Sequence, residues 1–252
     1  MRCLKLIVQY DGTDFSGFQR IPGKRTVQGE LERAIRRVMQ ENIRIAGAGR
    51  TDAGVHASGQ VVSFSTNCTI PLEKVTIALN SVLPKDISIS DAAEVNPDFH
   101  ARYSAISRTY RYTILNAELP DALQARYTHW ERAAVDESLM ETASRFLVGI
   151  HDFSSFCTAV PNTGHSIREI KNISVSRQNN RVIIEIKANA FLRNMARIIA
   201  GTLIQVGASR IQPHEVKEIL EARDRRKACK TAAASGLCLV NVEYADPYSS
   251  QL

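Results

Sequence analysis

An aspartate and an arginine stand two residues apart in a segment rich in small residues, Ala48–Ser58. Apolar residues alternate on both sides of this segment, which predicts two strands joined by a short loop that presents Asp52. A nucleophilic carboxylate must stay ionised after substrate has excluded water, and a nearby guanidinium such as that of Arg50 lowers its pKa. A catalytic Asp52 fits this pattern. The spacing alone, however, favours the commoner role of such an aspartate, an Asx-turn to its own backbone.

The segment Gly49–Ala57 resembles the active-site signature of the TruA family of tRNA pseudouridine synthases. Further segments match that family in the same order, and they are Tyr10–Thr13, Thr26–Gln28, Asp98–Tyr103, Arg108–Tyr112, Asp152–Phe156 and Ala188–Met195. One departure is Gly17-Phe-Gln19, where the family usually has a tryptophan in place of Phe18. The resemblance implies that Asp52 is the catalytic residue of an isomerase.

The resemblance also implies roles for residues in the second half of the chain. Tyr110 would stack on the target base, although alternation in a strand more often buries a tyrosine in the core. Arg197 would face the catalytic aspartate, so that Arg50 and Arg197 bracket Asp52. Arg193 lies four residues earlier on the same predicted helix, and we expect it to bind substrate or to lie on a solvated helix face.

Composition agrees with a nucleic-acid partner. The 252 residues carry a formal net charge of +6, with a pI near 9.2, which suits a polyanion. The five cysteines are odd in number and widely spaced, which argues against a disulfide framework or a zinc cluster. We expect no metal, no cofactor, no signal peptide and no membrane span, and a cytoplasmic location.

The apolar pattern predicts an α+β fold made of two similar halves, 1–105 and 106–252. Each half reads as a split βαβ (ferredoxin-like) unit with an antiparallel sheet, and the resemblance implies that the sheets flank a basic active-site cleft. Helices are predicted after the N-cap Thr26, from Pro71, and over residues 136–147, 192–206 and 213–223, and strands over residues 109–115, 167–176, 181–188 and 237–242.

The function implied by the resemblance is isomerisation of uridine to pseudouridine at positions 38 to 40 of the tRNA anticodon stem-loop, by a homodimer. The sequence leaves open whether Asp52 attacks C6 of the base, adds at C1′ or removes a proton from the sugar. Two other functions stay open, an RNA-binding module without catalysis and a synthase for another RNA. His56 is interpreted as a residue that orders the loop. The basic residues expected to contact phosphates, each with solvated surface as the alternative, are Arg20, Lys24, Arg25, Arg102 and Arg108.

Overall fold

A computed structural model describes residues 1–159 and 166–245 of the chain. It confirms the α+β class and divides into two compact units. Unit 1 is Met1–Arg108 together with the segment from Leu239, and unit 2 is Thr109–Cys238. The last strand, which the sequence placed in the second half, therefore belongs to unit 1 from Leu239 onward. None of the helices within the described residues is long and apolar enough to cross a membrane.

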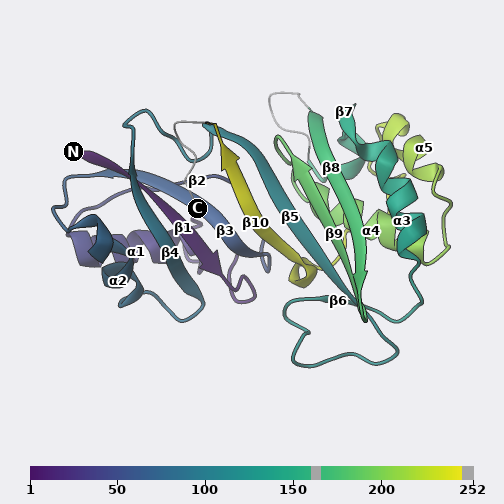
Figure 1. Cartoon of the computed structure of the whole chain (residues 1–252), viewed down its shortest axis with the longest axis horizontal. Coiled ribbons are helices and arrows are strands. Elements are labelled where there is room, and N and C mark those ends of the chain that lie inside the picture. Colours follow the sequence, from purple (N-terminus) through teal and green to yellow (C-terminus); the bar gives the residue numbers. More distant parts are fainter. Residues whose placement is uncertain (160–165, 246–252) are drawn as a thin grey trace. The chain divides into compact units, whose positions relative to one another are not determined.

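Unit 1 contains two helices and most of its strands before residue 96. In chain order its elements are β1 (Arg2–Tyr10), α1 (Val27–Met39), β2 (Ala46–Gly47), β3 (His56–Thr66), α2 (Leu72–Asn80), β4 (Ile87–Val95) and β10 (Leu237–Tyr244). Strand β1 pairs antiparallel with both β3 and β4, and β2 and β10 both pair with β3 (Figure 1). The order β4-β1-β3-β2 fits a split βαβ unit.

The core of unit 1 is formed where α1 meets the sheet. Thr26 caps the helix by accepting a hydrogen bond from the Gly29 amide at 3.3 Å, as its place before an apolar period predicts. The buried face of α1 carries Val27, Leu31, Ala34, Ile35 and Met39, and the β1 side chains of Leu4, Leu6 and Val8 are fully buried. The loop between β2 and β3 is therefore carried by strands that are paired with each other and buried in this core.

Unit 2 repeats part of this arrangement with longer connections. Its elements are β5 (Ala105–Asn116, which begins in unit 1), β6 (His129–Glu131), α3 (Glu137–Ser144), β7 (Gly149–Asp152), β8 (Ile167–Gln178), β9 (Arg181–Ala188), α4 (Met195–Gly207) and α5 (Glu215–Ala222), with short 3-10 turns at Arg145–Leu147, Ser154–Phe156 and Ala234–Gly236. The sheet order is β5-β9-β8-β7, with β6 parallel to β5. The order β5-β9-β8 matches β1-β3-β2 of unit 1.

Candidate active site

Asp52 lies on the connection between β2 and β3, residues 48–55, which we call the Asp52 loop. The side chain of Asp52 is partly buried, whereas Thr51 before it is buried. The Val55 amide donates to the Asp52 carbonyl at 3.2 Å, and Gly54 has a φ of 78°, so the chain turns immediately after the aspartate. The loop therefore presents the carboxylate from a defined backbone conformation.

Three buried polar side chains tie the Asp52 loop to the sheet. The hydroxyl of Tyr10, the last residue of β1, lies 2.8 Å from the Thr51 hydroxyl. The side-chain amide of Gln60, on β3 and fully buried, donates to the Gly49 carbonyl at 2.7 Å and to the Tyr10 hydroxyl at 3.3 Å. The Gly49 amide in turn donates to Gln60 Oε1 at 3.2 Å. A satisfied buried network of this kind fixes one loop conformation.

The segment that follows β1 covers the other side of the loop. Phe18 donates its amide to the Thr51 carbonyl at 3.0 Å. A Cβ on Gly12 would lie 2.0 Å from the Val55 carbonyl oxygen, and one on Gly17, whose φ is 93°, would lie 2.9 Å from the Thr51 carbonyl oxygen. Backbone approaches this close require glycine. The Tyr10–Thr13 and Gly17–Gln19 segments therefore hold the Asp52 loop in place.

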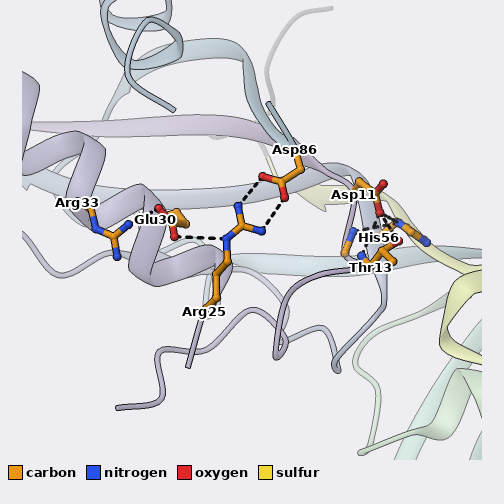
Figure 2. Close-up of polar contacts among 8 residues, drawn as sticks. Asp11, Thr13, Arg25, Glu30, Arg33, His56 and Asp86 are labelled. Atoms are coloured by element: carbon orange, nitrogen blue, oxygen red, sulfur yellow. Dashed lines mark hydrogen bonds and ion pairs between the residues drawn. The ribbon is translucent and has the colours of Figure 1, made fainter. Parts of the chain in front are cut away.

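His56, the first residue of β3, joins the same two segments. Its Nδ1 accepts a hydrogen bond from the Gly12 amide at 3.0 Å and lies 3.2 Å from Asp11 Oδ1. Asp11 Oδ1 also accepts from the Thr13 amide at 3.0 Å, and Figure 2 shows Asp11, Thr13 and His56 together. The structure agrees with His56 as a loop-ordering residue.

Arg50 does not make the contact with Asp52 that its spacing suggested. It is exposed, and it forms no ion pair within 4.0 Å with any carboxylate among residues 1–159 and 166–245. Instead it lines a small hollow together with Arg44 and Arg102. A local contact between Arg50 and Asp52 is absent because the turn at Thr51 buries that residue while leaving the arginine in solvent.

Three of the basic residues expected to contact phosphates, Arg108, Arg25 and Arg20, have partners within the protein. Arg108 is 9% exposed, and its guanidinium donates to the carbonyls of Ala48 at 3.0 Å, Arg102 at 2.6 Å and Ala105 at 3.2 Å. It thereby secures the start of the Asp52 loop. Arg25 lies between Glu30 and Asp86 (Figure 2), at 2.7 Å from Asp86 Oδ2, and this hydrogen bond raises the pKa of Arg25.

Arg20 and Lys24 line a larger hollow of about 800 Å³. Arg20 is paired there with Glu32 at 3.2 Å. The two residues remain exposed on the surface of unit 1.

The other predicted site residues belong to unit 2. Tyr110 on β5 is 7% exposed, and its ring packs edge-on to Phe191 with centroids 4.8 Å apart. Arg197 on α4 donates from Nε to the Ala232 carbonyl at 2.8 Å and from Nη1 to Asn194 Oδ1 at 3.1 Å. These bonds fix the direction of its guanidinium.

The sequence predicted that Arg193 and Arg197 share one helix, but the structure places only Arg197 on α4. Helix α4 begins at Met195, because Asn194 before it has a φ of 61° and interrupts the helical conformation. Arg193 lies in the preceding turn and is exposed, and its carbonyl accepts from the Thr158 amide at 3.2 Å. The spacing of four residues therefore does not place the two arginines on one helix flank.

The Asp52 loop lies in a region of the chain that matches a known protein family. A family model described as tRNA pseudouridine synthase matches residues 6–104 and 143–245, which include the Asp52 loop, β9 and α4. The chain belongs to the tRNA pseudouridine synthase family. It is 46% identical over 244 residues to tRNA pseudouridine synthase A of Caldicellulosiruptor saccharolyticus, covering 97% of this chain and 100% of that one. It is 47% identical over 246 residues to the protein of the same name from Moorella thermoacetica, again covering 97% and 100%.

The sequence singles out Asp52 but not the residues that support its loop. Tyr10, Gly12 and Gly17 lie in segments that resemble the family, yet nothing in their local pattern predicts contact with the Asp52 loop. One sequence pattern pointed to Gln60, because this polar residue alternates in phase with Val62 and Phe64 of β3, and the structure shows that it is fully buried. A buried amide needs partners, and here the partners are the loop backbone and Tyr10.

Proposed function

We propose that this member of the tRNA pseudouridine synthase family converts uridine to pseudouridine at positions 38 to 40 of the tRNA anticodon stem-loop, with Asp52 as the catalytic residue. The observation that carries the proposal is a partly buried aspartate on a loop held by the Tyr10–Thr51–Gln60 network. A residue whose only role is an Asx-turn does not need such support from three other segments. Family membership and the relatives' names supply the substrate class.

The reaction needs no net redox change and no external energy. The N1–C1′ glycosidic bond breaks, the uracil rotates while it is bound, and a C5–C1′ bond forms. C5 then loses its proton and N1 gains one, so atoms and electrons balance. The carboxylate of Asp52 attacks C6, adds at C1′ or takes a proton from the sugar, and each route needs the ionised form. We propose that no cofactor takes part.

Residues of unit 2 complete the proposal. Tyr110 would supply a ring for the target base, which must leave its stack at a cost of about a few kcal/mol. Arg197 and Arg193 would bind the same substrate, and Arg50 would contact it from the Asp52 loop. The two hydrogen bonds of the Arg197 guanidinium already restrict its direction, so less side-chain entropy is lost when a ligand binds. This supports a binding role.

We further propose that the enzyme works in the cytoplasm as a homodimer. Sedimentation of the purified protein tests the second part, since a monomer at micromolar concentration would contradict it. The net charge of +6 is compatible with a tRNA partner.

A tritium-release assay tests the function directly. Isomerisation of tRNA labelled with tritium at C5 of uridine releases the label to water, whereas binding alone does not. Labelled tRNAs with uridine kept at only one of positions 38, 39 and 40 locate the target. Retention of all the label by tRNA that the protein binds would identify an RNA-binding module, and release from another RNA only would identify a different substrate.

A further inference from the structure

A small hollow of about 170 Å³ lies beside the Asp52 loop within unit 1. Its lining includes three arginines and three rings, which are Arg44, Arg50, Arg102, Phe18, His100 and Tyr103. The remaining lining residues are uncharged, so no carboxylate borders the hollow. Arg50 is two residues from Asp52, which limits the distance between their Cα atoms to about 7 Å. The hollow therefore borders the Asp52 loop at Arg50.

The ring of Tyr103 is an exposed aromatic surface in this hollow. The residue is 76% exposed, and its ring lies on that of His100, with centroids 4.4 Å apart and planes at 34°. The amides of Arg102 and Tyr103 both approach His100 Nδ1, at 3.2 and 3.4 Å, and the Ser104 amide donates to the His100 carbonyl at 2.9 Å. This tight turn holds the tyrosine ring against the histidine, and the Arg102 guanidinium lies over the same ring at 5.5 Å from its centroid, while most of the residue stays exposed.

The three arginines of the hollow differ from most others in unit 1. Arg2, Arg20, Arg25 and Arg33 each lie within 4.0 Å of a carboxylate. In the described part of the chain, Arg44, Arg50 and Arg102 have no such partner, and all three are exposed. Their positive charge is therefore not neutralised by the protein, which suits an anionic ligand.

We propose that this hollow binds a nucleotide of the RNA that flanks the target uridine, with its base stacked on Tyr103 and its phosphates near Arg44, Arg50 and Arg102. An exposed aromatic face bordered by cations is the combination that binds unpaired nucleotides. An acidic peptide would use the cations but would leave the tyrosine face uncovered. The inference rests on the proposed function, because it takes RNA as the substrate, and it adds a second base-binding site to that function.

The first test compares two substitutions of Tyr103 in steady-state kinetics on an anticodon stem-loop RNA. Tyr103→Leu removes the ring, and we expect kcat/KM to fall about 5- to 150-fold through KM, because a base–aromatic stack is worth that range. Tyr103→Phe keeps the ring and should recover most of the loss. The matched control is Tyr127→Leu, which removes an exposed tyrosine of unit 2 and should leave the kinetics unchanged.

The second test identifies the base. A set of stem-loop RNAs, each with one abasic nucleotide next to the target, is used with wild-type protein and with Tyr103→Leu. At one position the abasic RNA should cost the wild type the same factor as the substitution, and the two changes together should cost no more than either alone. Additive losses at every position would overturn the stacking role, as would a Tyr103→Leu protein with wild-type KM.

The third test concerns the phosphates. Arg44→Gln should weaken RNA binding and reduce the slope of log affinity against log salt by about 1. Arg111→Gln is its control, because Arg111 is paired with Glu185 at 2.7 Å, and its slope should equal that of the wild type. An unchanged slope for Arg44→Gln would overturn the phosphate contact.

These outcomes are separable from the fate of the proposed function. If wild-type protein forms no pseudouridine, the function fails, and the same comparisons are made by filter binding, which still decides the nucleotide site. If wild-type protein forms pseudouridine and Tyr103→Leu has wild-type kinetics and affinity, only the nucleotide site fails.

Discussion

The Tyr10 hydroxyl lies 2.8 Å from the hydroxyl of Thr51, the residue immediately before Asp52. Tyr10 ends β1 and Thr51 is buried in the Asp52 loop, so this contact links the first strand of unit 1 to the backbone next to Asp52, the proposed catalytic residue. A hydrogen bond this close to a reacting group sets its position, and small misplacements there are costly to catalysis.

Tyr10→Phe should therefore reduce kcat more than it reduces stability. Loss of the hydroxyl removes its bonds to Thr51 and Gln60, which costs about 1 kcal/mol of unfolding free energy. The control is Tyr112→Phe, because the buried Tyr112 hydroxyl donates to the Ala233 carbonyl at 3.0 Å. Both variants should lose similar stability in urea unfolding, but only Tyr10→Phe should lose tritium release. Equal kcat values for the two would contradict a positioning role.

Gly17→Ala and Gly23→Ala form a second matched pair. Both glycines have positive φ, 93° and 71°, so alanine strains either position by about 1 to 2 kcal/mol. A Cβ at Gly23 meets no atom within 4 Å, whereas one at Gly17 meets the Thr51 carbonyl oxygen at 2.9 Å. We expect Gly23→Ala to lower the melting temperature only, and Gly17→Ala to lower kcat as well. A Gly17→Ala enzyme with normal kcat would show that the loop tolerates displacement.

Asp52→Asn should abolish pseudouridine formation while tRNA binding persists or tightens, because the change removes one negative charge and the reactive oxygen but little volume. Asp136→Asn is the control, since Asp136 caps α3 by accepting from the Ser138 amide at 2.8 Å, a role that asparagine fills well. Tritium release, filter binding and a thermal melt are measured on each variant. A folded Asp52→Asn protein with near-normal turnover would leave Asp52 with only the Asx-turn role.

Tyr110→Ala should lose much of the activity, because stacking on a base is worth about 1–3 kcal/mol. Tyr110→Phe keeps the ring and should retain most of it. Since the ring also packs on Phe191, a thermal melt of both variants separates lost stacking from lost folding. If the phenylalanine variant is as inactive as the alanine variant, the hydroxyl takes part in proton transfer and the stacking assignment is wrong.

Stability of unit 2 should fall as the solution is acidified from pH 7.5 to 5.5. Burial lowers the pKa of His129 below its usual value of 6.5, and the charge of Glu131 only partly offsets this. The unfolded state therefore takes up a proton first as pH falls below about 6.5, and the free energy of unfolding decreases. His129→Gln should flatten this part of the pH profile measured by urea unfolding. His214→Gln, at an exposed position before α5, is the control, and equal profiles for the two variants would refute the assignment.

The sequence predicted the elements better than it predicted contacts between them. The N-cap at Thr26, the turn between β8 and β9 and the helices α1 to α5 all follow from local periodicity and turn residues, and the structure places them within a few residues. The predicted start of α4 was wrong. The helix begins after Asn194, whose left-handed backbone conformation cannot be recognised from the spacing of apolar residues.

The site was predictable only through resemblance. Spacing suggested an ion pair between Arg50 and Asp52, but Arg50 is exposed and forms none within the described residues, and the buried Arg108 donates to the Ala48 carbonyl of the loop. These outcomes depend on residues distant in sequence, such as Ala48 and Arg108, which are 60 positions apart. Local patterns contain no information on such pairs.

Unit 1 is discontinuous along the chain, since β10 arrives only after the whole of unit 2. During synthesis β1 to β4 emerge first, yet β10, which also pairs with β3, is made only after the whole of unit 2. Until then the edge of β3 is available for wrong pairing. Synthesis of unit 1 therefore starts before that of unit 2 but is completed after it. We expect a chain that stops before Leu239 to be inactive even though it contains the entire Asp52 loop.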